Sequence, residues 1–426
     1  MKTCLSCLLL LFCLCSAQAK TRKAVYIVLD GIPADYIERV RPTHIFDIAR
    51  QGGYARAYTG GEVGGYSQTP TISAIGYMNI LTGTWMNKHR VNGNSNLKPN
   101  YNYWSIFRLA KAQKKPCKTA LFSSWTDNRT VLIGAGKPET GNLTVDYVYD
   151  GYELDEARFP PRPDQLHIFS IDSVVSHEAA QCIRRDAPDL SWVYLWYTDS
   201  GFHLFGDGAY MDRYVRKTDE LVGLIWQAVQ YREAHFDEEW MVIVTTDHGR
   251  NESGHDHGGQ LNRERSVWIS TNIRQLNRHF THASLSLVDI QPTLSRFMGF
   301  EVPQEVAFER DGIAFFGPTD IYDLASHPYD HTVVLSWKSE KTSADATIYM
   351  ATTNRFASGG TDEWKVVGKV KARSGRYVVD LSQYPSSKFY KFAVATPCNV
   401  LTRWVYKSKQ PVTSVLKRPR RSALFR

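Results

Sequence analysis

The sequence has few cysteines and no long hydrophobic run. No stretch reaches the about 20 consecutive apolar residues that a membrane-spanning helix needs, so no transmembrane segment is predicted. Four of the seven cysteines lie within the first 15 residues, and the others are Cys117, Cys182 and Cys398. These three are far apart and lack CxxC or Cys/His spacing. We therefore expect one disulfide at most, no disulfide framework and no cysteine metal site.

The charge balance has no strong excess of either sign. Lys+Arg 51 against Asp+Glu 43 gives a net charge of +8, and 43% hydrophobic residues exclude a disordered chain. The positive excess is concentrated at the end, where residues 417–426 carry five bases and no acid. We expect a solvated basic tail there, with contact to nucleic acid or an anionic surface as the alternative. No specific nucleic-acid partner is predicted.

The first residues have the features of an export signal. Lys2 is followed by the apolar run Leu8–Leu14 and by the small-residue cleavage pattern Ala17-Gln18-Ala19. Residues 1–19 are therefore expected to be a signal peptide, without a lipid-attachment pattern. The predicted localisation is periplasmic or secreted.

The pattern of apolar segments predicts an α/β fold. Short apolar, β-rich runs occupy residues 24–29, 118–125, 192–197 and 240–245. Helical spacing is found over Ile37–Arg50, Ser73–Leu81 and Met211–Glu233. Continuous apolar strands alternating with helices indicate a mostly parallel sheet flanked by helices. Ligands bind such sheets at the carboxyl ends of the strands.

Two further segments depart from this pattern. Residues 126–185 are rich in Gly, Pro and Tyr and are expected to form a cap insertion within a catalytic domain spanning residues 20–326. After residue 327, short strands follow one another at near-regular spacing. They predict a β-sandwich-like domain over residues 327–412, followed by the basic tail 413–426.

Asp and His residues cluster directly after three of the predicted strands. Asp30 follows the first strand, Asp199 and His203 lie in TDSGFH, and Asp247 and His248 lie in TTDHG, with GHDHGG a few residues later. Each motif alone is compatible with a turn or a helix cap. Together they supply enough carboxylate and imidazole ligands for two Zn²⁺-like ions. Paired metal ions about 4 Å apart are one known solution for phosphate-ester chemistry.

Ser73 is the candidate nucleophile. It lies in PTISAIGYMNILTG at the predicted start of a helix, where backbone N–H groups and the helix dipole favour an anion. A serine oxygen there could attack phosphorus and form a covalent intermediate, although a simple N-cap is the alternative.

These motifs together resemble the alkaline phosphatase superfamily, and within it the nucleotide pyrophosphatase/phosphodiesterase family. The resemblance covers about residues 22–315. It rests on Asp30-Gly31, Pro70-Thr71-Ile72-Ser73, Thr82-Gly83, Asp199 to His203, Asp247-His248-Gly249 and His257-Gly258-Gly259. Their order and spacing are specific as a set.

The resemblance implies a role for each matched residue. Those implied to hold one divalent ion are Asp30, Asp247, His248 and the Ser73 oxygen, and those implied to hold the other are Asp199, His203 and His257. Zn²⁺ fits this ligand set. Ser73 takes the nucleophile position, with Thr71 as the fallback. Asn94 takes the place of an asparagine that hydrogen-bonds a phosphate oxygen, or else is a turn residue.

The expected substrate is a small phosphodiester, nucleotide or related pyrophosphate compound. A monoester dianion usually needs an extra cation one helical turn from the nucleophile, and Ala74 to Tyr77 offer none. Lys88, His89 and Arg90 weaken this argument because they are close in sequence. SAIGY stands where the family has TFPNH, so the pocket beside the nucleophile is expected to differ.

Other functions stay open at this stage. A phosphomonoesterase or a phosphonate hydrolase of the same superfamily is the enzymatic alternative; a sulfatase is disfavoured because Ser73 is followed by Ala-Ile-Gly. The non-enzymatic alternative is an exported protein whose C-terminal domain binds glycans or a cell surface. Exposure of Trp337, Trp364 or Trp404 would favour binding over packing.

Overall fold

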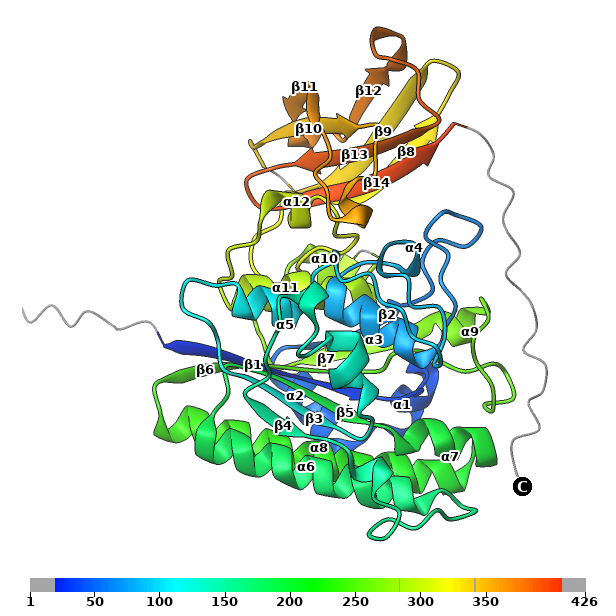
Figure 1. Ribbon diagram of the computed structural model, residues 1–426, viewed down its shortest axis with the longest axis vertical. Helices are drawn as coiled ribbons and strands as arrows, with labels where there is room; N and C mark the ends of the chain where they lie inside the picture. The colour runs from blue at the N-terminus through cyan, green and yellow to red at the C-terminus, as the bar shows by residue number, and fades with distance from the viewer. Residues whose placement is uncertain (1–19, 283, 341, 408–426) are drawn as a thin grey trace, which may run out of the picture.

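A seven-stranded sheet forms the centre of the larger part of the molecule (Figure 1). The computed structural model describes residues 20–282, 284–340 and 342–407, so the predicted signal peptide and basic tail lie outside the described residues. In sheet order the strands are β2 (Gly53–Tyr58), β7 (Ser266–Thr271), β6 (Glu238–Thr245), β1 (Thr21–Leu29), β5 (Leu190–Leu195), β3 (Thr119–Ser123) and β4 (Tyr147–Tyr149). Strand β1 pairs in parallel with β5 and β6, whereas β7 pairs antiparallel with both of its neighbours, β6 and β2. The predicted α/β fold with a mostly parallel sheet is confirmed.

Helices cover both faces of this sheet, which explains its continuous apolar strands. Val25, Ile27 and Leu29 of β1 face one core, and Ala24, Tyr26 and Val28 face the other. The first core is closed by α1 (Ala34–Val40), α2 (Thr43–Gln51), α6 (Leu166–Asp186) and α8 (Ala209–His235). The second is closed by α3 (Ser73–Thr82), α5 (Ile106–Lys111) and α11 (Ile290–Phe297). Because both faces are buried, β1 contains no alternating polar positions after Lys23.

The remaining helical segments are short. They are α4 (Met86–His89), α7 (Tyr197–Phe205), α9 (Asn262–Arg265), α10 (Arg278–His282), α12 (Gln304–Ala307), a π-helical turn at Asn128–Ile133, and 3₁₀ turns at Pro138–Thr140, Tyr152–Leu154, Leu287–Asp289, Phe356–Ser358, Ala372–Ser374 and Leu381–Gln383. Among the helices of the described ranges, none has the length and apolar character to cross a membrane.

The structure differs from the sequence prediction at two places in the larger part. The helix expected over Ile37–Arg50 is two helices, because Arg41 adopts a left-handed conformation (φ 50°) before Pro42. Proline disfavours the α conformation of the residue before it and offers no N–H of its own. Two segments of the expected cap over 126–185 belong instead to the central fold: Tyr147–Tyr149 joins the sheet, and Leu166–Asp186 packs on it as α6.

The C-terminal part consists of two antiparallel sheets. One has the order β11 (Lys365–Lys371), β10 (Asp345–Ala351), β13 (Phe389–Ala395), β14 (Val400–Tyr406), and the other β12 (Arg376–Asp380), β9 (Thr332–Ser339), β8 (Ile321–Pro328). A shared core of buried residues lies between them. The sandwich-like architecture is confirmed, but β8 begins at Ile321, before the predicted boundary at 327. The start of β8 was not predicted because Asp323, His327 and Pro328 interrupt its apolar pattern.

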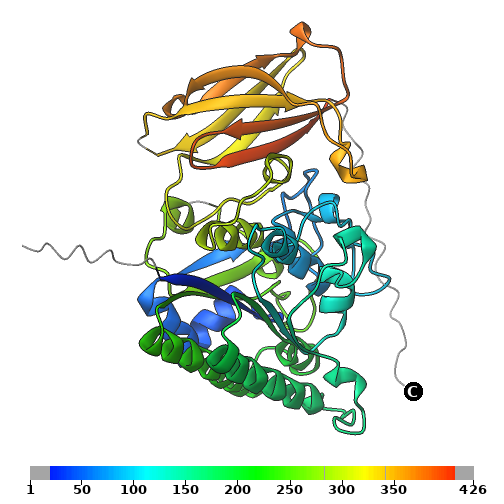
Figure 2. The same ribbon diagram turned by 60° about the vertical axis from the view of Figure 1, so that its left-hand side comes forward.

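This sandwich packs against the face of the larger part that carries α3, α5 and α11 (Figure 1, Figure 2). Trp337 and Trp404 are buried, and Trp404 stacks on Tyr66 at a centroid distance of 5.8 Å. Trp364 is half-buried and packs edge-on against Phe308. These tryptophans therefore contribute to packing and do not form an exposed binding surface.

A buried lysine joins the two parts. Lys391 of β13 bonds the Glu309 carboxylate and lies 2.8 Å from Asp362 Oδ2, and its side chain is 1% exposed. The backbone carbonyl of Glu309 accepts a 2.7 Å bond from Lys88 of α4. Two acids and two lysines thus connect α4 to the sandwich away from water.

Replacing Lys391 by methionine is expected to lower the free energy of unfolding by about 3–5 kcal/mol. The substitution leaves two carboxylates buried without their cation, which is far more destabilising than losing an exposed pair. Urea unfolding followed by circular dichroism measures the effect. Lys338→Met, which removes a lysine 61% exposed and paired with Asp323, is the control and should change stability by less than about 1 kcal/mol. Equal effects of the two substitutions would contradict the prediction.

Candidate active site

The three predicted strand-end clusters meet at one edge of the central sheet. Strands β6, β1 and β5 are neighbours, and Leu29 of β1 is in register with Leu195 of β5. Asp30 directly follows β1, Asp247 follows β6 and Asp199 lies on α7 after β5. Parallel pairing therefore brings together side chains more than 200 positions apart in sequence.

One group of donor atoms surrounds the Nε2 atom of His248. That atom lies 3.3 Å from Asp30 Oδ1, 3.4 Å from Asp247 Oδ2 and 3.2 Å from Ser73 Oγ. Donors bound to one Zn²⁺ at about 2.0–2.1 Å in a tetrahedral site are about 3.3–3.4 Å apart. The spacing therefore fits a single metal ion held by these four residues.

The remaining atoms of these side chains are already engaged. Asp30 Oδ2 accepts hydrogen bonds from the Tyr77 and Tyr194 hydroxyls, the latter at 2.7 Å. Asp247 Oδ1 accepts a 3.0 Å bond from the Gly31 N–H. In contrast, Asp30 Oδ1 and Asp247 Oδ2 are buried and find no hydrogen-bond partner within the described ranges. Two orphaned carboxylate oxygens that point at one imidazole nitrogen are the strongest sign of a cation site.

Two buried carboxylates in this group also make its electrostatics unfavourable without a cation. Burial and the nearby Asp30 carboxylate raise the pKa of Asp247 well above its usual range. Burial alone would lower the pKa of His248, but Asp247 and Asp30 outweigh it and raise the pKa to about 9. His248 Nδ1 lies 2.9 Å from the Gly249 carbonyl, so a proton on Nδ1 leaves Nε2 as the metal-binding atom.

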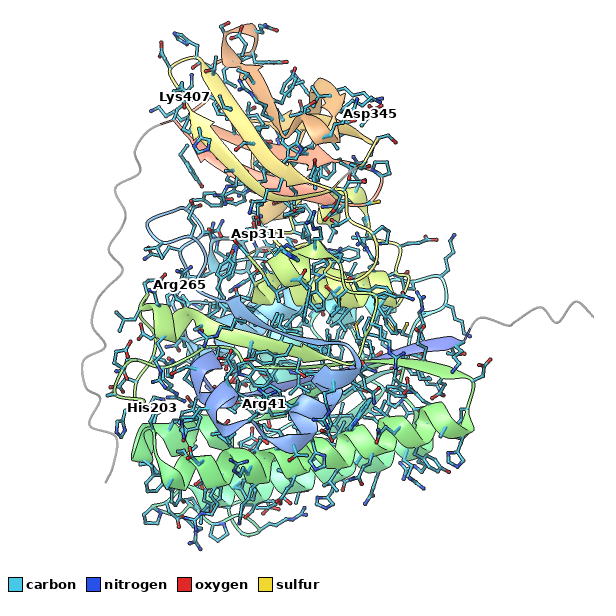
Figure 3. All side chains as sticks on the ribbon, turned by 180° about the vertical axis from the view of Figure 1, so that it is seen from behind. Arg41, His203, Arg265, Asp311, Asp345 and Lys407 are labelled. Carbon is cyan, nitrogen blue, oxygen red and sulfur yellow. The ribbon has the colours of Figure 1, made fainter. Side chains whose placement is uncertain are left out.

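A second group is formed by Asp199, His203 and His257. Asp199 Oδ1 lies 3.4 Å from His203 Nε2 and 3.5 Å from His257 Nε2, and the two nitrogens are 3.2 Å apart. Asp199 and His203 share one face of α7 because they are four residues apart. His203 is the most accessible member, with 39% of its side chain exposed (Figure 3). These separations again fit a tetrahedral ligand set.

The two groups adjoin, and His257 links them to the segment that precedes Ser73. The rings of His248 and His257 stack at a centroid distance of 3.7 Å. Burial lowers the pKa of His257 well below its usual range, which keeps the imidazole neutral, as a metal ligand must be. His257 Nδ1 lies 2.8 Å from the Thr71 carbonyl, so Nε2 faces Asp199. All six predicted side-chain ligands are thus brought together, and Asp30, Asp199, Asp247, His248 and His257 form the carboxylate/imidazole groups able to hold a metal ion.

Ser73 begins α3, and Asn94, from a later loop, contacts the first turn of this helix. Ser73 is the first residue of the helix and is buried. A Cβ at Gly76 would come within 2.8 Å of Asp247, so only glycine lets the helix approach so closely. Asn94 is exposed, and its Oδ1 accepts a 2.9 Å bond from the Ala74 N–H. This bond commits Asn94 Oδ1 to the backbone of the first turn of α3.

Thr71, the fallback nucleophile, is occupied elsewhere. Its hydroxyl donates to the Gly259 carbonyl at 3.0 Å and accepts from the Gly258 N–H at 2.9 Å. Both bonds hold the loop that carries His257. Thr71 therefore supports a ligand loop, whereas Ser73 faces the donor atoms.

Sequence reasoning missed Tyr77, Tyr194 and Arg250. The two tyrosines fix Asp30, and the buried Arg250 pairs with Asp199. Tyr77 lies one helical turn after Ser73, and Arg250 directly follows the DHG motif. These sequence positions alone make both residues candidates for a place beside the site. Burial would raise the pKa of Asp199, but Arg250, His203 and His257 hold it well below its usual range.

Two of the three basic residues close to Ser73 in sequence, Lys88 and His89, are bonded to other residues. Lys88 is fully buried and lies 2.6 Å from Asp311. His89 pairs with Asn79 at 3.0 Å, and burial lowers its pKa to about 3. Neither residue supplies the additional cation that a phosphomonoester site needs.

A cavity of about 700 Å³ lies apart from the donor atoms. It is lined by residues of both parts of the molecule, including Arg403 of the sandwich and Arg265 and Asp311 of the larger part. The last two are labelled in Figure 3. None of the predicted metal ligands lines it. The Asp/His groups spaced to hold a metal ion, among the described residues, all lie at the strand-end clusters and not in this cavity.

The comparisons with known proteins found one matching family and several solved structures of low sequence identity. The family described as Type I phosphodiesterase / nucleotide pyrophosphatase matches residues 24–310. No curated protein matches the chain.

Three solved structures illustrate the distant similarities. A putative sulfatase from Bacteroides thetaiotaomicron is 11% identical, with a TM-score of 0.47 over 85% of this chain and 86% of that one. Murine ectonucleotide pyrophosphatase/phosphodiesterase 5 is 12% identical, with a TM-score of 0.46 over 66% and 96%. Phosphonoacetate hydrolase from Sinorhizobium meliloti is 16% identical, with a TM-score of 0.39 over 54% and 57%.

Proposed function

Because the chain belongs to the type I phosphodiesterase/nucleotide pyrophosphatase family, we propose that it hydrolyses phosphodiester or pyrophosphate bonds through a covalent Ser73 intermediate. The proposed cofactors are two divalent ions, with Zn²⁺ as the best fit to the ligands. Asp30, Asp247, His248 and Ser73 would hold one ion, and Asp199, His203 and His257 the other. The observation that carries the proposal is the convergence of Ser73 Oγ and two orphaned carboxylate oxygens on His248 Nε2.

The protein groups position the substrate and the nucleophile. Ser73 Oγ forms a bond to phosphorus while the bond from phosphorus to the leaving oxygen breaks, and the proton lost by Ser73 ends on the leaving oxygen. Water then hydrolyses the phosphoserine, giving its oxygen to phosphorus and a proton back to Ser73. Divalent ions bound at the two groups supply charge stabilisation for the attacking and leaving oxygens. The N-terminus of α3 and the Asn94 amide offer N–H donors to a phosphate oxygen.

The charge of the site favours a diester monoanion. Asn94 is neutral, and Lys88 is committed to Asp311. Arg250, the cation nearest the ligands, is fully buried, and Asp199 occupies its guanidinium. A dianionic monoester would therefore lack a cationic partner at its additional charged oxygen.

We expect chromogenic phosphodiesters to be cleaved at least about tenfold faster, in kcat/KM, than the matching monoesters. Metal-loaded protein would be assayed side by side on a diester, a monoester, a sulfate ester and a phosphonate with the same leaving group. A clear preference for the monoester or the phosphonate would instead support the alternatives within the superfamily. Absence of hydrolysis in all four assays would contradict the proposed enzyme and favour a binding protein.

The proposed location is outside the cytoplasm, either periplasmic or secreted. It is supported by the signal-like pattern of residues 1–19 alone. Glycan or surface contact by the C-terminal sheets gains no support from its tryptophans, which are buried or half-buried.

A further inference from the structure

Arg250 is a fully buried arginine at the centre of the ligand cluster. It directly follows Asp247-His248-Gly249 and is 0% exposed. Burial of a guanidinium is unfavourable unless its charge and its donors are paired. Its contacts therefore show what the arginine does in the folded protein.

The guanidinium bonds to three other segments that carry predicted ligands. Nε donates to the Gly31 carbonyl at 3.0 Å, Nη1 to the His255 carbonyl at 3.0 Å and Nη2 to the Asp199 carbonyl at 3.1 Å. Nη2 also donates to Asp199 Oδ1. Gly31 adjoins Asp30, and His255 is two residues before His257, so one side chain ties together the segments that carry both ligand groups.

Arg250 pairs with a carboxylate of the second group and with none of the first. The first group contains the Asp30 and Asp247 carboxylates, for which the described residues offer no lysine or arginine partner. The second group has one carboxylate, Asp199, and Arg250 pairs with the same Oδ1 atom that faces His203 and His257. In the protonation states that bind a metal, with neutral imidazoles and charged carboxylates, the formal charge is −2 in the first group and −1 + 1 = 0 in the second, counting Arg250 with its partner.

We propose that Arg250 makes the two metal sites unequal, so that the Asp199/His203/His257 site is the weaker, exchangeable one. The proposal rests on the proposed two-metal hydrolase. A dication at the second site meets a fixed positive charge across a shared carboxylate in a buried environment, where Coulomb interactions are strong. At the first site it meets two carboxylates with orphaned oxygens. Activity is then set by occupancy of the second site when the metal is scarce.

Calorimetric titration of the chelator-stripped full chain with Zn²⁺ tests this. Wild-type protein should bind two ions in two steps whose dissociation constants differ by at least about tenfold. His203→Ala, at a partly exposed position, should remove only the weak step. Two steps of equal affinity, or loss of the tight step in His203→Ala, would overturn the proposal even if no Arg250 variant folds.

Two Arg250 variants separate its charge from its hydrogen bonds. Arg250→Gln retains an N–H donor without the charge and should tighten the weak step by about tenfold, whereas Arg250→Lys retains the charge and should keep the steps apart. Arg263→Gln is the matched control, since Arg263 pairs with Asp35 and Asp207 and not with a ligand, and should bind as wild type. An Arg250→Gln protein whose weak step is unchanged or weaker contradicts the charge argument. Absence of any Zn²⁺ binding would instead contradict the proposed function.

Discussion

Replacing Ser73 by alanine is expected to lower turnover by about 10⁴-fold or more while leaving metal content nearly intact. The substitution removes the attacking oxygen, and covalent-catalysis knockouts in other enzymes have effects of this size. The six carboxylate and imidazole ligands are untouched, so metal analysis by mass spectrometry should find up to two ions per chain. Diester hydrolysis under saturating metal measures the loss.

Variants at Thr71 provide the control for this assignment. Ser73→Thr keeps a hydroxyl at the same place and should retain substantial activity. Thr71→Val removes both hydroxyl bonds to the Gly258-Gly259 loop, which carries His257. We therefore expect this variant to bind metal more weakly because His257 is held less firmly. Thr71→Ser keeps the hydroxyl and should restore metal binding. A fully active Ser73→Ala protein together with a dead Thr71→Val protein of normal metal content would move the nucleophile to Thr71.

Exhaustive chelation is expected to abolish hydrolysis, and Asp247→Asn should do the same by removing one ligand of the first site. The same substitution should stabilise the metal-free fold by about 1 kcal/mol. Burial and Asp30 raise the pKa of Asp247 in the folded protein. Above the ordinary carboxyl pKa, the unfolded chain ionises Asp247 more easily than the folded protein does, and this difference lowers the free energy of unfolding. Asparagine has no charge and removes this loss of stability. The side-chain oxygen of the introduced amide can still accept the Gly31 N–H bond.

Thermal melts of the metal-free and Zn²⁺-loaded proteins separate these effects. Zn²⁺ should raise the melting temperature of the wild type much more than that of Asp247→Asn, because ligand binding stabilises only the folded state that holds the site. Full activity of the wild type after exhaustive chelation would contradict the metal-dependent mechanism. An Asp247→Asn protein less stable than the wild type without metal would contradict the electrostatic argument.

Much of this site could be predicted because parallel strands end at a common edge. Asp30, Asp199 and Asp247 each follow a recognisable apolar strand, so their meeting follows from topology alone. The helix starting at Ser73 could likewise be predicted from local spacing, and the structure begins it at that residue.

What the sequence could not supply is the set of contacts between distant segments. Tyr194 reaches Asp30 from a neighbouring strand across 164 positions, and Arg250 reaches Gly31 across 219. Such pairs depend on how side chains orient within the packed fold. Helix α6 was missed for a different reason: its apolar positions, such as Ile168, Ile171 and Val175, have helical spacing, but Gly, Pro and Tyr before them suggested a loop.

The buried bonds of Lys391 and Lys88 bear on the modularity of the chain. A separable accessory module would meet its neighbour through a wet surface that either side could lose without harm. Here, truncation after residue 320 would remove Lys391, the cationic partner of the Glu309 carboxylate, and uncover the segment that Lys88 of α4 bonds, three residues beyond α3. Chimeras that exchange the sandwich between relatives therefore need to keep Lys391, Asp362 and Glu309 together. For the same reason, the larger part should not be expressed without the sandwich.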